Sequence, residues 1–407
     1  MYGSKSVSFF NSSSTIYQNY TAKLRQISLI ALILQSYRIV SKFLNIMNQY
    51  RRIAVKVGSN VLTRADGTLD ITRMSSIVDQ IAVLRKHGVE VVLVTSGAVA
   101  SGKSEMKGCP KLDTVSARQL FSAVGQAKLI NRYYEFFRDH GIVCGQVLTM
   151  KENFSTRLHY LNQKHCMEVM LENGVLPIVN ENDTVSVTEL MFTDNDELSG
   201  LIASMLGMDA LVILSNIDGV YTGNPADPAS KLIREIKPES ELDGESIISK
   251  SKSQYGRGGM ETKFRIARKV ADEGIAVIIA NGTRQNILEK LILGNGSEPC
   301  TLFAPSSHPV SSVKKWIAHS EDFAKGEIHI NEGAFIALTS GEASSLLPIG
   351  VVGVEGNFEK DDIVRIVSPD GNSFAVGRTS YDSKEAREAI GKQGLKPIIH
   401  YDYLCIE

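Results

Sequence analysis

Residues 89–104 read VEVVLVTSGAVASGKS, and this stretch indicates the fold more clearly than any other. Its first seven residues are almost all apolar, which is typical of a strand buried on both faces of a parallel sheet. Similar runs alternate along the chain with amphipathic stretches of helical spacing. The predicted strands are 53–57, 89–95, 142–148, 175–179, 210–214 and 275–280, and the predicted helices are 72–87, 116–141, 159–173, 198–206 and 262–273. This alternation predicts an α/β fold, a three-layer sandwich with a mostly parallel central sheet.

The character of the sequence changes after about residue 304. Pro305 and Pro309 punctuate a linker over 305–324. Beyond it lie short apolar runs separated by glycines, at 327–330, 334–338, 351–354, 362–367, 374–377 and 398–405. Short strands with frequent turn signals predict a small β-barrel-like domain over 325–407, after an α/β domain over 47–304.

The composition excludes several classes of protein. With 44 Lys and Arg against 45 Asp and Glu, the net charge of −1 gives no general attraction to nucleic acid or to a membrane surface. The five cysteines are scattered and form no CxxC pair. This usage is typical of a reducing compartment, and we expect a cytoplasmic protein. No apolar run reaches the length of about 18 residues that predicts a membrane span.

Residues 1–46 have a composition of their own. They contain five Lys and Arg, nine serines and no acidic residue, as transit peptides do. Met47 stands shortly before the first predicted strand. We therefore favour a stretch that precedes the true start over a leader peptide, and in either case we expect it to be disordered.

Acidic and carboxamide side chains gather over 180–203, NENDTVSVTELMFTDNDELSGLIA, between two predicted strands. A solvated loop is the simplest explanation of such a charge run. The carboxamides of Asn180, Asn182 and Asn195 among the acids favour a site instead. Together these groups suit a polar substrate that carries both an ammonium and a carboxylate, beside a hydrated metal.

Two candidate phosphate sites compete. The sequence GAVASGKS matches the P-loop pattern, in which backbone amides hold phosphates and Lys103 reaches the β and γ oxygens. That pattern is short, and no Walker-B-like aspartate follows a downstream strand. The second candidate is dispersed and comprises Lys56 in the first strand, Gly58 behind it and the glycine-rich YGRGGMETK, which ends in Lys263. We favour the dispersed set, because Gly58 permits close backbone approach to an anion.

Several motifs make the chain recognisable: VKVGSNVLT, VTSGAVASG, AVGQAKL, LPIVNENDTV, FTDNDELS and GRGGMETK. In order and spacing they resemble the glutamate 5-kinases of the amino-acid kinase family, from about Arg51 to the end of the chain. The later KGEIHINEGA, SSLLPIGV and GNFEKDDIVRI resemble the PUA domain of many microbial members. The resemblance implies the amino-acid kinase fold and the ATP-dependent phosphorylation of the side-chain carboxylate of L-glutamate to glutamyl 5-phosphate, the first step of proline biosynthesis. It also explains GAVASGKS as a glycine-rich turn of the family.

The same resemblance assigns the phosphoryl transfer to four residues. Lys56 and Lys263 would neutralise the transferred phosphoryl group, and Asp196 would hold both lysines in place. Asp194 would lie at the phosphoryl and magnesium site. Mg²⁺ would be carried by ATP, and no direct protein ligand is predicted.

The resemblance also assigns the binding residues. L-Glutamate would bind at Ser96, Gly97, Asp183 and Asn195, braced by Asn180 and Glu181. ATP would bind at Lys56, Gly58, Ser215, Asn216, Arg257, Gly258, Gly259, Met260, Glu261, Thr262 and Lys263. Many relatives have Thr-Asp in place of Ser215-Asn216, and we expect this difference to alter nucleotide contacts but not the phosphoryl chemistry.

The resemblance further implies feedback inhibition by proline and a homo-oligomer. The alternatives are a sibling kinase for another acid, carbamate or a nucleoside monophosphate, an RNA-binding protein, and a P-loop NTPase. The tail over 325–407 is not strongly basic and has no stacked aromatic platform, so we do not expect RNA binding through the PUA domain. Lys103→Ala separates the NTPase, which it would inactivate, from the kinase that we favour.

Overall fold

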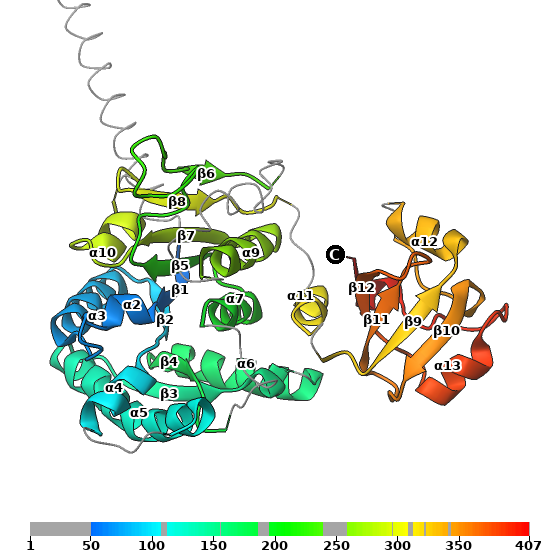
Figure 1. Cartoon of the computed structure of the whole chain (residues 1–407), viewed down its shortest axis with the longest axis horizontal. Coiled ribbons are helices and arrows are strands. Elements are labelled where there is room, and N and C mark those ends of the chain that lie inside the picture. The colour runs from blue at the N-terminus through cyan, green and yellow to red at the C-terminus, as the bar shows by residue number, and fades with distance from the viewer. Residues whose placement is uncertain are drawn as a thin grey trace, which may run out of the picture.

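The computed structural model of the chain describes residues 50–106, 112–154, 156–185, 195–238, 259–294, 296–307, 312–320, 323–340 and 343–406. These residues form two sheets with their helices (Figure 1). The predictions for residues 1–46 and for Asp194, Arg257 and Gly258 fall outside the described residues. Among the helices described, none is long and apolar enough to cross a membrane.

The first sheet has eight strands in the order β3-β4-β2-β1-β5-β7-β8-β6. Neighbouring strands are parallel except for β8, which runs antiparallel to β7. The central strands read as apolar runs because helices cover both of their faces. In chain order the strands are β1 (Arg52–Val57), β2 (Glu90–Val94), β3 (Cys144–Thr149), β4 (Leu176–Glu181), β5 (Ala210–Ser215), β6 (Glu235–Ile236), β7 (Ala276–Asn281) and β8 (Cys300–Phe303).

Helices form a layer on each side of this sheet (Figure 1). One layer contains α2 (Ser59–Leu62), α3 (Ile71–Lys86), α4 (Ala98–Glu105), α5 (Thr114–Asp139) and α10 (Ile287–Ile292). The other contains α6 (Arg157–Glu172), α7 (Asn195–Leu206) and α9 (Gly259–Asp272). Each layer buries its own apolar cluster against the sheet. The predicted three-layer α/β sandwich is confirmed.

Three long helices begin where a side chain caps them. Asp70 accepts a hydrogen bond from the amide of Arg73 at the start of α3, and Asp113 accepts two at the start of α5. Thr156 accepts from the amide of His159 at the start of α6. Such caps satisfy amides that have no partner within the helix. The predicted bounds of these three helices differ from the observed ones by only one or two residues.

The second sheet has the order β10-β9-β11-β12-β13 and is mixed, because β9 and β11 are parallel and the other pairs antiparallel. Its strands are β9 (Gly326–Ile330), β10 (Val351–Gly356), β11 (Ile363–Val367), β12 (Ser373–Arg378) and β13 (Leu404–Ile406), with helices α12 (Glu332–Thr339) and α13 (Ser383–Ala389). Two predictions here are wrong. Residues 334–338 belong to α12, which Asn331 caps, and within 398–405 the strand begins only at Leu404.

A short helix, α11 (Ser312–Ala318), lies between the two sheets (Figure 1). It contacts α7 on one side and β12 and β13 on the other. Trp316 and Ile317 are buried in this position. The two units therefore meet through α11.

Candidate active site

The carboxyl ends of β1, β2, β4 and β5 meet at one edge of the first sheet, because these strands are parallel. A cavity of about 600 Å³ opens there. Sheets of this kind bind ligands at this edge. Its lining comes from those strand ends and from α2, α4, α5, α7 and α9, and includes Lys56, Gly58, Ser96, Gly97, Lys103, Arg118, Asn180, Glu181, Asp183, Asn195, Asp196, Ser215 and Lys263.

Asp196 is the charged centre of this cavity. Its Oδ1 lies 2.6 Å from Lys56 Nζ, and its Oδ2 lies 2.7 Å from Lys263 Nζ. Burial alone would raise the pKa of this carboxyl, but the two ammonium groups outweigh burial and hold that pKa below its ordinary value. The carboxylate therefore stays ionised and holds two cations side by side, one from β1 and one from α9.

Asn195 begins α7 and ties together the ends of β2 and β4. Its Nδ2 lies 2.7 Å from the carbonyl oxygen of Thr95, 3.0 Å from Ser96 Oγ and 3.1 Å from Asn180 Oδ1. Asn180 in turn donates to Gln126 Oε1 on α5, at 2.8 Å. A carboxamide nitrogen has two hydrogens, so these three acceptors already engage both. Asn195 thus holds in position the ends of β2 and β4 that line the cavity.

Arg118 reaches the cavity from α5. Its Nε and Nη2 both donate to Asp183 Oδ1, at 2.9 and 2.5 Å, and Nη2 lies 3.2 Å from Glu181 Oε2. Both carboxylates are buried, and a buried charge without a partner is costly. Sequence reasoning does not find Arg118, because 65 residues separate it from Asp183 and helical spacing alone does not tell which residue faces a cavity.

The GAVASGKS segment forms no phosphate-binding loop. Gly97 has a φ of 103°, a left-handed conformation that favours glycine, and α4 begins at the next residue. The residues that would wrap phosphate in a P-loop are therefore helical, and Lys103 lies within the helix rather than at its start. The expected glycine-rich turn is confined to Gly97. Lys103 nevertheless lines the cavity.

The predicted nucleotide residues fall into two groups. Lys56, Gly58, Ser215 and Lys263 line the cavity. The others that the structure describes adjoin them in sequence but are not among its lining residues: Asn216, Gly259, Met260, Glu261 and Thr262.

The family models match both units of the chain. The amino acid kinase family model matches residues 51–281, which is more than half of the chain, and the PUA domain model matches residues 326–401. The chain belongs to the amino acid kinase family. It is 67% identical over 359 residues to the glutamate 5-kinase of Bacteroides thetaiotaomicron, a match that covers 88% of this chain and 99% of that protein. It is 49% identical to the glutamate 5-kinase of Chlorobaculum tepidum, over 88% of this chain and 98% of that protein.

This amino acid kinase is therefore an enzyme of the glutamate 5-kinase group, with a PUA domain. The described carboxylates of its cavity, Glu181, Asp183 and Asp196, all pair with cationic side chains.

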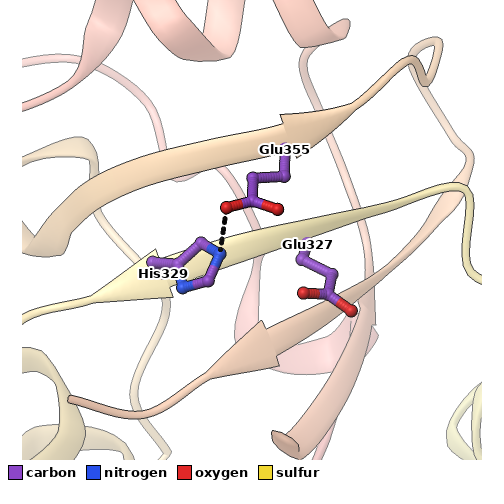
Figure 2. Close-up of side chains that lie close together, drawn as sticks. All are labelled: Glu327, His329 and Glu355. Atoms are coloured by element: carbon purple, nitrogen blue, oxygen red, sulfur yellow. Dashed lines mark ion pairs between the residues drawn. The ribbon is translucent and has the colours of Figure 1, made fainter. Parts of the chain in front are cut away.

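Among the described residues of the kinase, one group of potential metal ligands occurs, and it lies on the second sheet. Glu327 and His329 on β9 and Glu355 on β10 place their ligand atoms within 4.8 Å of one another (Figure 2). His329 Nε2 lies 3.3 Å from Glu355 Oε1, and these side chains are 31% and 71% exposed. Exposed ion pairs of this kind are common on protein surfaces, so we assign no ion to the group.

Proposed function

We propose that this kinase transfers the γ-phosphoryl group of ATP to the side-chain carboxylate of L-glutamate, giving glutamyl 5-phosphate and ADP. The observation that carries the proposal is the pair of lysines, Lys56 and Lys263, held 2.6 and 2.7 Å from the two oxygens of Asp196. The high identity to proteins named glutamate 5-kinase supports the choice of substrate.

In the proposed reaction, a carboxylate oxygen of glutamate forms a bond to the γ-phosphorus as the bond to the bridging oxygen of ADP breaks. No general base is needed, because the nucleophile is ionised near neutral pH. The main requirement is to neutralise charge on the transferred phosphoryl group. Lys56 and Lys263 would supply the positive charge, and Asp196 would fix their positions. Asp194 would lie at the phosphoryl and magnesium site.

For binding, we propose that Ser96, Gly97, Asp183 and Asn195 form the glutamate site. Gly58, Ser215 and Asn216 would lie along the nucleotide, together with residues 257–263. Mg²⁺ would be held by the ATP phosphates rather than by the described carboxylates, and it would neutralise phosphate charge.

The wider role follows from the product. We propose that the reaction opens proline biosynthesis, that proline inhibits the enzyme at a site overlapping that of glutamate, and that the enzyme is a cytoplasmic homo-oligomer. In this proposal the kinase domain spans 47–304, the linker 305–324 and the PUA domain 325–407. The PUA domain would have a structural or regulatory role rather than bind RNA.

The test is a hydroxylamine trap. The protein is incubated with ATP, Mg²⁺ and an acid, and acyl phosphate is captured as hydroxamate while ADP release is followed. We expect hydroxamate from L-glutamate but not from aspartate or N-acetylglutamate. ADP release without hydroxamate would show that the protein is an NTPase and that the proposal is wrong.

A further inference from the structure

We propose that Arg118 binds the α-carboxylate of the substrate, so that the Arg118–Asp183 ion pair recognises the zwitterionic end of an α-amino acid. This inference rests on the proposed function, because it assigns the second end of the same substrate. It makes Arg118 a specificity-determining residue of the glutamate site.

The cavity has cationic side chains at two separate places, each held by buried carboxylates. Lys56 and Lys263 flank Asp196 at one of them, where phosphoryl transfer is proposed. Arg118 lies at the other, beside Asp183, and lines the same cavity. Glutamate carries a carboxylate at each end, so two separate places with cationic side chains suit it, one for the reacting carboxylate and one for the α-carboxylate.

The adjacent opposite charges of Arg118 and Asp183 also match the two charged groups of an α-amino acid. The ammonium and the carboxylate of an α-amino acid are bonded to the same carbon, so their protein partners must be adjacent. Arg118 and Asp183 are in direct contact, and both hydrogen bonds between them use Asp183 Oδ1, while Arg118 Nη2 also reaches Glu181 Oε2. Oδ2 can therefore accept from the substrate ammonium while the guanidinium donates to the α-carboxylate, since arginine offers five N–H donors in a planar fork.

The other expected partner for the α-carboxylate is already engaged. Asn195 belongs to the proposed glutamate site, but its Nδ2 has three acceptors around it at 2.7 to 3.1 Å, so its part there is to hold the strand ends rather than to donate to the α-carboxylate. To bind a carboxylate it would have to give up contacts that hold the strand ends together. The Arg118 side chain is 33% exposed and lines the cavity, so a substrate carboxylate can reach its guanidinium.

A substrate analogue separates direct contact from positioning. In L-isoglutamine the α-carboxylate is a carboxamide, while the ammonium and the γ-carboxylate are kept. The values of kcat/KM for glutamate and isoglutamine are measured by hydroxamate formation in the wild type and in Arg118→Gln, with competitive inhibition constants where an analogue does not turn over. Arg118→Lys keeps the charge. Lys103→Gln removes a different cation of the cavity, which comes from α4. Arg132→Gln changes a partly exposed arginine on α5, the helix that contains Arg118.

We expect the wild type to prefer glutamate over isoglutamine by about 10- to 100-fold, the range for a hydrogen bond to a charged group. In Arg118→Gln this ratio should fall close to one, mainly because KM for glutamate rises. Arg118→Lys should keep part of the preference, and Lys103→Gln and Arg132→Gln should keep all of it.

Three results would overturn the proposal. In the first, the wild type does not distinguish glutamate from isoglutamine. In the second, Arg118→Gln lowers kcat/KM for both substrates equally, as expected if Arg118 only positions Asp183. In the third, Lys103→Gln is the variant that abolishes the preference. If the wild type makes no hydroxamate from glutamate at all, it is the proposed function that fails.

Discussion

Lys56 and Lys263 come from distant parts of the chain and are brought together by one buried carboxylate. We expect Lys56→Ala or Lys263→Ala to lower kcat by about 100- to 1000-fold, or about 3–4 kcal/mol, as for the loss of a group that stabilises transition-state charge. Lys103→Ala is the matched control and should have a mild effect. The measurement is hydroxamate formation at saturating ATP and glutamate. A large loss of kcat in Lys103→Ala alone would contradict this assignment.

At the residue level, five of the residues that motif resemblance assigns to the site line one cavity, and their roles stay predictions: Lys56, Ser96, Asp183, Asn195 and Asp196. These residues lie at strand ends or helix starts, where a motif has a fixed position. Arg118 was not found because it lies inside a long amphipathic helix, where one polar residue looks like another. Its partner is set by the fold and not by neighbours in sequence.

Elements α4 and α5 cross so closely that glycine is required at the contact. A Cβ on Gly102 would lie 1.9 Å from the carbonyl oxygen of Phe121, and a Cβ on Gly125 would lie 1.9 Å from that of Ala98. We expect Gly125→Ala to reduce the free energy of unfolding by about 1–3 kcal/mol, as for overpacking in a core, or by more because backbone must move. It should also raise KM for glutamate, since both helices line the cavity.

Gly333→Ala in α12 is the control for this substitution. Its Cβ would meet only Asn331 Oδ1, at 3.5 Å. Alanine favours helix over glycine, so stability should be unchanged or rise slightly. Urea unfolding of both variants checks the prediction, and equal stability of Gly125→Ala and the wild type would contradict it.

The elements were predicted best where two signals agreed. Helices α3, α5 and α6 have both a capping side chain and a long amphipathic period. By contrast, the apolar run at 334–338 is too short for its period to distinguish helix from strand. Asn331 was the missed signal, because its side chain caps the amide of Ala334 and starts α12. Helix α4 was not predicted, because two serines and a glycine within eight residues are typical of a loop. The close packing of α4 on α5 accounts for this composition.

A buried polar cluster joins helices α7, α9 and α11. In it, Glu273, just after α9, accepts a hydrogen bond from Ser204 on α7 and pairs with His319, just after α11. Burial would raise the pKa of Glu273, but His319 and Ser204 outweigh it and lower that pKa below 4.5. A lowered carboxyl pKa stabilises the fold above the ordinary pKa, and that contribution is lost as the pH falls through the folded value. Glu273→Gln should therefore cost about 3–5 kcal/mol near neutral pH, as for breaking a buried pair, and less in acid.

The measurement is denaturant unfolding of the wild type and Glu273→Gln at neutral and acidic pH. Glu172→Gln, at an exposed position on α6, is the control and should have little effect at any pH. If the loss of unfolding free energy in Glu273→Gln does not shrink in acid, the charge of the Glu273 carboxylate is not what stabilises this cluster.

At the scale of the whole molecule, α11 makes one continuous core out of two units. The cluster that packs α6, α7 and α9 on the first sheet also includes Trp316, Ile317 and, from the second sheet, Ile363 and Val376. Trp316 Nε1 donates to the carbonyl oxygen of Phe154, at 3.1 Å. Burial of this kind makes the stability of each unit depend on the other.

Trp316→Ala should therefore uncouple the two units. Loss of a buried tryptophan costs about 3–5 kcal/mol, and we expect the thermal unfolding of this variant to separate into two transitions where the wild type shows one. Trp316→Phe keeps an aromatic ring and loses the hydrogen bond to Phe154 and part of the buried ring volume, so it should keep a single transition at a lower midpoint. Differential scanning calorimetry distinguishes these cases. A single transition in Trp316→Ala, with the wild-type midpoint, would show that the PUA unit is held by contacts other than α11.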